Sequence, residues 1–579
     1  MVFLPPPSVP PLPYDPPDTV TIAEFMSNDR YGRFPISRSR NPFTCGITGR
    51  TFSTSESHQR TDLIARALSK ITGWQPNQDT CWDKVIGVYS FNTIDYLSVA
   101  HSVHKLSGIS SLANVAYSAA ELEHQLRSSG VKVLFTCAPV LDNALKAAKA
   151  TGIPEDKIFL FDVPGYPRPP SFKTVDDLVE LGRTLPPLEP LRWTKGQGAR
   201  QVAFLCYSSG TSGLPKAVMI SHRNVIANII QYVVYEEDAR RKLGIETQVV
   251  LGLLPFSHIY GLVVVAHSDA WRGDEIVVLP RFEFTPYLQA IQRFKINYLP
   301  VVPPIIVRML SSAKECLKYD LSSVRVLLTG AAPAGRETID ELLKVYPNWR
   351  VCQAYGMTET STVVLLTSEL DIHLGTSGCL LPGVRAKIID FDGREVTTEN
   401  TPGELLIQSP SAVLGYLNNE HATAQAFVWD EDGRWVKTGD EVIMTKAPSG
   451  NQHFTVVDRL KELIKVKGHQ VAPAELEAHL LTHPLVDDCA VIAVPHDTDG
   501  EVPKAFVVRP ANPSPAPSSD AEAAKAIIKH VQDHKARYKW LKGGVEFVEV
   551  IPKSPSGKIL RRLLRDREKE ARRAKGTKL

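Results

Sequence analysis

Short, continuously apolar runs alternate with amphipathic stretches along the first 300 residues. The apolar runs, rich in β-forming residues, fall at 84–90, 131–137, 157–163, 201–209 and 275–280. Continuous apolar character is typical of parallel strands that are covered on both faces of a sheet. The stretches 118–130 and 139–152 between such runs are predicted helices. This alternation predicts an α/β fold built on a doubly wound sheet.

The pattern changes past about residue 380. Three short apolar runs, RAKIIDF, GELLIQS and HFTVVD, are separated by Gly, Pro, Asp and Asn turns, which predicts a barrel-like or antiparallel subdomain. After Asp458 come a charged strip, a helix opened by Pro473, two strands, a Pro/Ser/Ala linker and a helix from Asp520. These elements predict a small α+β unit. We therefore expect two domains, residues 1–457 and residues 458–579.

Composition and charge narrow the class of protein. The chain is 43% hydrophobic and 22% charged, as in soluble globular proteins, and its net charge of +3 gives no reason to expect a nucleic-acid partner. The eight cysteines form no Cys-x-x-Cys pair, which argues against a cysteine zinc site or a disulfide framework and for reduced, intracellular thiols. The amino terminus lacks the features of a signal peptide.

One long apolar run, residues 249–266, raises the question of a membrane span. Its centre carries Pro255, Ser257 and His258, which would be costly to place in lipid. We expect a buried strand–turn–helix passage there, and no membrane span.

The stretch YSSGTSGLPKAV, residues 207–218, offers many backbone amides, hydroxyls and one lysine at a single bend. Such a loop suits an anion, and its place after a predicted strand puts it at the carboxyl end of the sheet, where α/β proteins bind ligands. The spacing is not that of a Walker A loop. Without that position, an ordinary Ser/Gly surface loop would be the favoured interpretation.

Five further motifs follow this loop in a characteristic order. They are TGAAPAG (329–335), YGMTE (355–359), TGD (438–440), DRLKELIKVKG (458–468) and PKSPSGK (552–558). In this order and spacing, over nearly the whole chain, they resemble the adenylate-forming superfamily, which includes acyl-CoA synthetases, 4-coumarate–CoA ligases and firefly luciferase. The stretches IAEFMSNDRYGR, DHKARYKWLKGG and IPKSPSGKILRRLLRD look closest to fungal phenylacetyl-CoA ligases.

The resemblance implies a fold and a set of reactants. The fold is a large amino-terminal adenylation (AMP-binding) domain of doubly wound αβα lobes plus a β-barrel-like subdomain, followed by a small mobile α+β domain. The reactants are ATP with Mg²⁺, a small carboxylic acid and CoA. The acid is adenylated with release of pyrophosphate, and a thiol then displaces AMP.

The resemblance also implies which residues bind the nucleotide. The ATP/AMP site would comprise Ser208, Ser209, Gly210, Thr211, Ser212, Gly213, Lys216, Gly330, Ala331, Ala332, Tyr355, Gly356, Thr358, Asp440, Arg459 and Lys558. Within it, the loop and Thr211 would hold phosphate, Thr358 would contact the α-phosphate, and Glu359 with Thr211 would bind Mg²⁺. The adenine would lie between residues 330–332 and the Tyr355 ring, and Asp440 would accept the ribose hydroxyls.

A second set of residues would bind the acid and the thiol. By the resemblance, His258 lies against the substrate carboxylate and guards entry of the thiol; a satisfied core histidine is the alternative. The acyl-pocket candidates are His258, Tyr260, Gly261, Val302, Pro303, Ala331 and Ala354. Ala354 stands where many 4-coumarate ligases have glycine, so its methyl group is expected to narrow the pocket.

Two lysines of the small domain are expected to act in turn. The catalytic set is Lys558, Thr211, Glu359, His258 and Lys465. Lys558 would bridge the acyl carboxylate and the α-phosphate during adenylation. Lys465 would enter only after the small domain rotates about a hinge near Asp458–Lys461. Lys467, Gly468 and Gln470 would then meet CoA.

An acid–CoA ligase is the function that these residues favour, for an arylacetic, cinnamic or medium-chain acid. The alternative is a stand-alone adenylation enzyme that loads a carrier protein in trans. Residues 256–259 contain no carboxylate, which disfavours an amino-acid substrate. A luciferase-like oxidation is a rarer outcome of the same motifs, and a non-catalytic nucleotide sensor would be expected to lose Lys558 or Glu359, both of which are present.

The last residues suggest a location. Thr577-Lys578-Leu579 approximates a Ser-Lys-Leu peroxisomal address, against the alternative of a basic tail that happens to end in Lys-Leu. We expect a peroxisomal protein that the peroxisomal import receptor recognises, or otherwise a cytoplasmic one.

Overall fold

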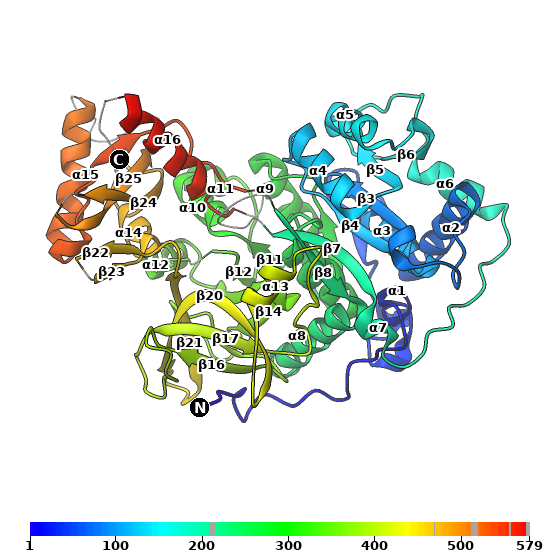
Figure 1. Ribbon diagram of the computed structural model, residues 1–579, viewed down its shortest axis with the longest axis horizontal. Helices are drawn as coiled ribbons and strands as arrows, with labels where there is room; N and C mark the ends of the chain where they lie inside the picture. The colour runs from blue at the N-terminus through cyan, green and yellow to red at the C-terminus, as the bar shows by residue number, and fades with distance from the viewer. Residues whose placement is uncertain are drawn as a thin grey trace.

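The described residues contain four β-sheets (Figure 1). Three lie in the large amino-terminal part of the molecule and one lies in the small carboxyl-terminal part. The structure is a computed structural model. It describes residues 1–208, 215–332, 334–467, 469–496, 498–510, 519–554 and 557–574.

The first lobe is a seven-stranded sheet of order β18-β8-β7-β4-β3-β5-β6. Its parallel strands are β3 (Val85–Tyr89), β4 (Ile109–Leu112), β5 (Val133–Cys137), β6 (Ile158–Phe161) and β7 (Val202–Ser208). Every residue of β3, β5 and β6 is buried, as the continuous apolar runs predicted. The two predicted helices are α4 (Ala119–Ser129) and α5 (Leu141–Thr151). At one edge, β8 (Lys216–Ser221) and β18 (Gly415–Tyr416) pair antiparallel.

The second lobe is a nine-stranded sheet. Its parallel core comprises β9 (Val249–Gly252), β10 (Glu275–Val278), β11 (Tyr298–Val301), β12 (Val326–Thr329) and β13 (Arg350–Met357), and β1 (Phe43–Cys45) joins it parallel to β10. Antiparallel strands complete the sheet: β2 (Thr51–Phe52), β14 (Thr362–Leu366) and β15 (Cys379–Leu380).

The long apolar run folds inside this lobe. It forms β9, a turn and then η7 (Tyr260–Asp269), a π-helix of which every residue is buried. This confirms the expected strand–turn–helix passage. No helix among the described residues has both the length and the apolar character to cross a membrane.

The third sheet is antiparallel, as the short runs past residue 380 predicted. It comprises β16 (Arg385–Ile389), β17 (Gly403–Gln408), β19 (Phe427–Asp430), β20 (Gly433–Lys446) and β21 (Gln452–Arg459). β21 ends at Arg459, where the chain passes into the small unit.

The small unit is α+β, as expected, and lies at one end of the molecule (Figure 1). Its strands are β22 (Ile464–Val466), β23 (His469–Val471), β24 (Asp488–His496), β25 (Gly500–Val508) and β26 (Val545–Phe547), and its helices are α14 (Pro473–Leu480), α15 (Asp520–His534) and α16 (Arg561–Ala574). α14 also packs against β21 and α12 (Arg336–Val345) of the large part.

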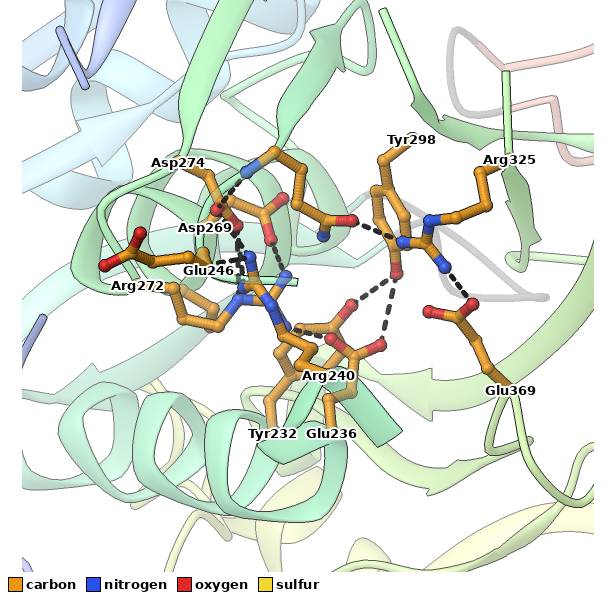
Figure 2. A network of polar contacts seen from close by, with 12 residues as sticks. Tyr232, Glu236, Arg240, Glu246, Asp269, Arg272, Asp274, Tyr298, Arg325 and Glu369 are labelled. Carbon is orange, nitrogen blue, oxygen red and sulfur yellow. Dashed lines mark hydrogen bonds and ion pairs between the residues drawn. The ribbon is translucent and has the colours of Figure 1, made fainter. Parts of the chain in front are cut away.

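A buried ionic network joins α8 (His222–Lys242) to the end of η7 (Figure 2). Arg240 makes two hydrogen bonds to Asp274, of 3.0 and 2.7 Å, and both side chains are almost fully buried. Arg272 bonds Asp269 at 2.6 Å and also pairs with Glu236. Because a buried charge is costly unless it is paired, these contacts fix the position of η7 against α8.

The network continues toward the sheet through hydroxyl groups. The Tyr298 and Tyr232 hydroxyls lie 2.8 Å apart, and the Tyr298 hydroxyl donates to Glu236 at 3.3 Å. Tyr298 belongs to β11, so the network links α8, η7 and the central strands of the second lobe. These groups were not predicted from the sequence.

Two adjacent arginines of α8 allow a matched test of the network. Arg240→Ala removes one of the two guanidinium partners of the buried Asp274 carboxylate, because Arg272 Nε lies 3.3 Å from Asp274 Oδ2 and remains. We expect the substitution to lower the free energy of unfolding by about 2–3 kcal/mol. Arg241→Ala removes an exposed ion pair with Asp238 and is expected to cost no more than about 1 kcal/mol. Urea denaturation followed by tryptophan fluorescence measures both. Equal losses would show that the buried pair does not hold α8 and η7 together.

Candidate active site

The motif residues converge where strand ends of the second lobe meet the third sheet. β12 ends at Thr329 and leads into Gly330, and Tyr355 lies near the end of β13. The Tyr355 hydroxyl donates to Asp440 Oδ2 of β20 at 2.6 Å. Residues more than 80 positions apart therefore share one site.

Asp440 is a buried carboxylate whose position is set by the register between β20 and β21. It pairs with Arg459 across β20 and β21, and the Arg459 Nε lies 3.5 Å from Oδ1. Burial raises the pKa of Asp440, while Arg459 and the Tyr355 hydroxyl oppose that rise. A carboxylate has about four acceptor positions, so Asp440 retains capacity for the two hydroxyls of a ribose.

Glu359 is a second buried carboxylate. Tyr416 lies between Glu359 and Lys216 and contacts both side chains. The Tyr416 hydroxyl donates to Glu359 Oε1 at 2.7 Å, and the Lys216 Nζ lies 5.0 Å from the Tyr416 ring centroid. The pairing of β18 with β8 brings Tyr416 to this place. An anionic oxygen donor of this kind fits Mg²⁺, which prefers hard oxygen ligands.

Sequence reasoning missed Tyr416. The local sequence offers only the dipeptide Gly415-Tyr416 as a signal. Its importance appears only in the fold, where it pairs with β8, the strand that follows the phosphate loop. The loop itself, Ser209–Gly213 with Thr211, lies outside the described residues, as does Gly468. The backbone of Ser208 ends β7 beside this segment.

Lys558 reaches the site from the small unit. The pKa of Lys558 is lowered to about 8, because burial and the charge of Arg459 together outweigh the opposing charges of Asp440 and Glu359. The preceding Gly557 has φ +80°, and a Cβ there would lie 3.0 Å from Val302 Cγ2. Glycine thus lets the lysine loop approach an acyl-pocket candidate closely.

His258 is buried close enough to Lys558 to feel its charge, on the side of the site predicted to hold the acid. Its Nδ1 accepts a hydrogen bond from the Tyr260 amide at 3.3 Å, which leaves the proton of the neutral ring on Nε2. Burial and the charge of Lys558 lower the pKa of His258 to about 4. The histidine is therefore neutral at neutral pH and offers an N–H donor.

Several pocket candidates are in mutual contact. The Tyr260 hydroxyl donates to the Leu328 carbonyl at 3.1 Å. A Cβ on Gly330 would lie 3.3 Å from the Tyr260 ring and 3.2 Å from the Ala354 carbonyl oxygen. Gly261 packs against backbone, because a Cβ there would lie 2.3 Å from the Pro255 carbonyl oxygen.

The other predicted residues occupy defined places near these groups. Val302 is buried and precedes α10 (Pro303–Ser311), whose first residue is Pro303. Ala331 has φ +68° and is exposed, Ala332 and Thr358 are partly buried, and Gly356 lies so close to Thr362 that a Cβ there would be 1.7 Å from its carbonyl oxygen.

The residues expected to serve thioester formation lie on the β22–β23 hairpin. Lys465 pairs with Gln470, and its amide donates to Glu501, while Lys467 Nζ lies 2.9 Å from Asp499. Among the described residues, no hydrogen bond or ion pair joins Lys465 to Lys558, Asp440 or Glu359. The structure thus brings Lys558 into the site and leaves Lys465 exposed outside it.

Family comparison agrees with this assembly. Residues 38–417 match the AMP-binding enzyme family, and residues 475–558 match its carboxyl-terminal domain. The chain belongs to the AMP-binding enzyme family. It is 42% identical over 577 residues to the acyl-CoA ligase AFT1-1 of Alternaria alternata, covering 98% of this chain and 97% of that one. It is 37% identical over 570 residues to the acyl-CoA ligase easD of Emericella nidulans, covering 98% of this chain and all of that one.

Solved structures of adenylate-forming enzymes share the fold. The anthranilate CoA ligase AuaEII in complex with anthranoyl-AMP superimposes with a TM-score of 0.79 at 22% identity, covering 95% of this chain and 98% of that one. ATP-bound MatB from Rhodopseudomonas palustris superimposes with a TM-score of 0.75 at 23% identity, covering 95% of this chain and 100% of that one. The protein is therefore a ligase of the adenylate-forming class with the expected large and small domains.

The lowered pKa of Lys558 generates a prediction for this ligase. A lysine whose pKa is about 8 is an ammonium below that pH and loses its charge above it. We expect kcat/KM for acid-dependent pyrophosphate release, measured without CoA, to fall as pH rises through about 8. Lys558→Arg should work more slowly at neutral pH but keep its rate to higher pH, because a guanidinium stays protonated. An unchanged alkaline limb in that variant would assign the titration to another group.

Proposed function

We propose that the protein is an ATP-dependent acid–CoA ligase for an aryl or medium-chain carboxylic acid, of the phenylacetate or 4-coumarate kind. The observation that carries the proposal is the entry of Lys558 into a site formed by Asp440 and Glu359 of the large domain. An ammonium between a carboxylate substrate and a triphosphate offsets the charge that builds up as two anions meet.

Two steps would share the site. In the first, an acid oxygen attacks the α-phosphorus of ATP, and the bond to the β-phosphate breaks with release of pyrophosphate. In the second, the thiol of CoA loses its proton and attacks the acyl carbon, and AMP leaves. Glu359, with Thr211, would hold Mg²⁺, which neutralises phosphate charge.

CoA is the favoured acceptor, because relatives similar over the whole chain are named acyl-CoA ligases. The alternative remains a carrier protein loaded in trans. The acid is expected to be limited in width, because Ala354 carries a methyl group where glycine would leave room and because Gly557 of the lysine loop lies close to Val302. A panel of arylacetic, cinnamic and medium-chain acids, assayed for CoA-dependent AMP release, identifies both the acid and the acceptor.

The two lysines of the small domain separate the two steps. We expect Lys558→Ala to lose at least about 100-fold in acid-dependent pyrophosphate release, the size of effect seen when one preorganised charge-stabilising donor is removed. The same variant should still convert a supplied acyl-adenylate and CoA into thioester. Lys465→Ala should do the reverse, because domain rotation would bring Lys465 into the site only for the second step.

Lys525→Ala is a suitable control, because Lys525 is exposed on α15 of the same domain. It should leave both half-reactions unchanged. Equal loss of both half-reactions in Lys558→Ala and Lys465→Ala would contradict domain alternation and would mean that each lysine supports one common site.

The carboxyl terminus suggests where the ligase works, and we propose the peroxisome. Thr577-Lys578-Leu579 lies outside the described residues and approximates a peroxisomal address. A fluorescent protein fused to the amino terminus, with the carboxyl terminus left free, should give a punctate signal that coincides with a peroxisomal marker. Deletion of the last three residues should make the signal diffuse. A diffuse signal from the intact fusion would place the enzyme in the cytoplasm.

A further inference from the structure

Four histidines lie together on the small domain, outside the nucleotide site. His530 and His534 are four positions apart on α15, so they share one face of that helix. His479 belongs to α14, and His483 follows it four positions later. The two helices pack against each other, which brings the four rings together.

The rings are close enough to share a ligand. His479 stacks on His530 with centroids 4.2 Å apart, and His534 lies 5.3 Å from His479 and 5.1 Å from His530. One ring nitrogen from each of these three histidines can be chosen so that all three lie within 4.8 Å of one another. The His483 ring is 5.1 Å from His530.

The hydrogen bonds at the cluster leave coordinating atoms available. His479 Nε2 and His534 Nδ1 lie 3.3 and 2.9 Å from the His530 carbonyl oxygen, and His530 Nε2 lies 3.0 Å from Thr482 Oγ1. These contacts use one of the two nitrogens of the His479 and His534 rings, and the His530 ring also hydrogen-bonds the backbone of His479. His534 is exposed and the other two are partly exposed, so a small ion can reach them.

We propose that His479, His530 and His534 bind a transition-metal ion of the zinc class. Imidazole suits zinc, copper and nickel, and a His-x-x-x-His pair on one helix face presents two ligands to one ion. Zinc–nitrogen bonds of about 2.0–2.1 Å set tetrahedral ligands roughly 3.4 Å apart, so the rings need to close by about 1 Å. Small side-chain rotations supply a movement of that size. Water or His483 completes the shell.

The charges around the cluster permit a cation. Lys535 and Lys539 both pair with Glu475, whose carboxylate offsets part of their charge. Asp533 pairs with the exposed Lys529. Among the described residues, no lysine or arginine makes a hydrogen bond or ring contact with His479, His530 or His534.

An ion there would join α14 to α15 away from the face of α14 that docks on the large domain. Next to His479, Ala478 faces that domain, and a Cβ on Gly335 would lie 2.9 Å from Ala478 Cβ. Metal binding would therefore stiffen the small domain as one unit without entering the nucleotide site. This role is independent of the proposed acid–CoA ligase function.

Untagged full-length protein, freed of metal with a chelator, provides the test. Titration with Co²⁺ should give the visible absorption of a low-coordinate site at one equivalent, and Zn²⁺ should displace the Co²⁺. Zn²⁺ should also raise the temperature at which the small domain unfolds. His530→Ala and His534→Ala should each lower the affinity for the metal by on the order of 100-fold or more. Replacing a residue that only hydrogen-bonds a metal ligand already lowers metal affinity by about 10–100-fold.

His421→Ala is the matched control, because His421 is an exposed helical histidine of the large part, on α13 (Glu420–Ala426). It should bind metal as the unchanged protein does. Circular dichroism and pyrophosphate release should be the same in all variants as in the unchanged protein. If His530→Ala misfolds, His530→Gln replaces it in the metal titration. Absence of saturable Co²⁺ binding in the unchanged protein, or binding that survives the loss of His530 and His534, would overturn the proposal.

Discussion

Docking of the small domain on the large one buries an ammonium group between carboxylates of the candidate site. Lys558 belongs to the small domain, but its charge is balanced by Asp440 and Glu359 of the large one. Taking a lysine out of water is costly, and nearby carboxylates only partly offset that cost, as its lowered pKa shows. An incoming carboxylate and triphosphate would add the negative charge that the site lacks. Binding of the two anions would thus stabilise the ammonium form of Lys558.

Such a site requires a rigid frame on the side that does not move. The frame is supplied by strand pairing. The consecutive strands β20 and β21 set Asp440 against Arg459, and the pairing of β18 with β8 brings Tyr416 to Glu359. Behind it, the buried network of Figure 2 holds η7, the helix that begins with Tyr260. The predicted acyl side of the site is thus held in place by charged groups that lie outside the predicted substrate pocket. Their cost in desolvation is tolerable because nearly every one of them has a partner.

The sequence predicted the parallel strands well, for a physical reason. A strand buried on both faces must be continuously apolar, and runs such as 131–137 show this locally. Tyr416 and the Arg240–Asp274 pair were not predictable in this way. Their meaning comes from strand and helix pairings over tens of residues, and a tyrosine or arginine alone does not specify its partner. The histidine cluster is similar: its spacing is visible within each segment, but the packing of α14 on α15 is not.

The same ammonium links the docking of the small domain to the protonation of the acyl side. Lys558 contributes to the lowered pKa of His258, together with burial. While Lys558 is docked, His258 is held neutral and offers an Nε2–H group to an anionic oxygen. In the proposed rotation the lysine leaves, and one of the two causes of the lowered pKa leaves with it. The pKa of His258 then rises toward its ordinary value, which makes the ring a better proton acceptor when a thiol must lose its proton. Domain rotation would thus change the chemistry of a residue that does not itself move.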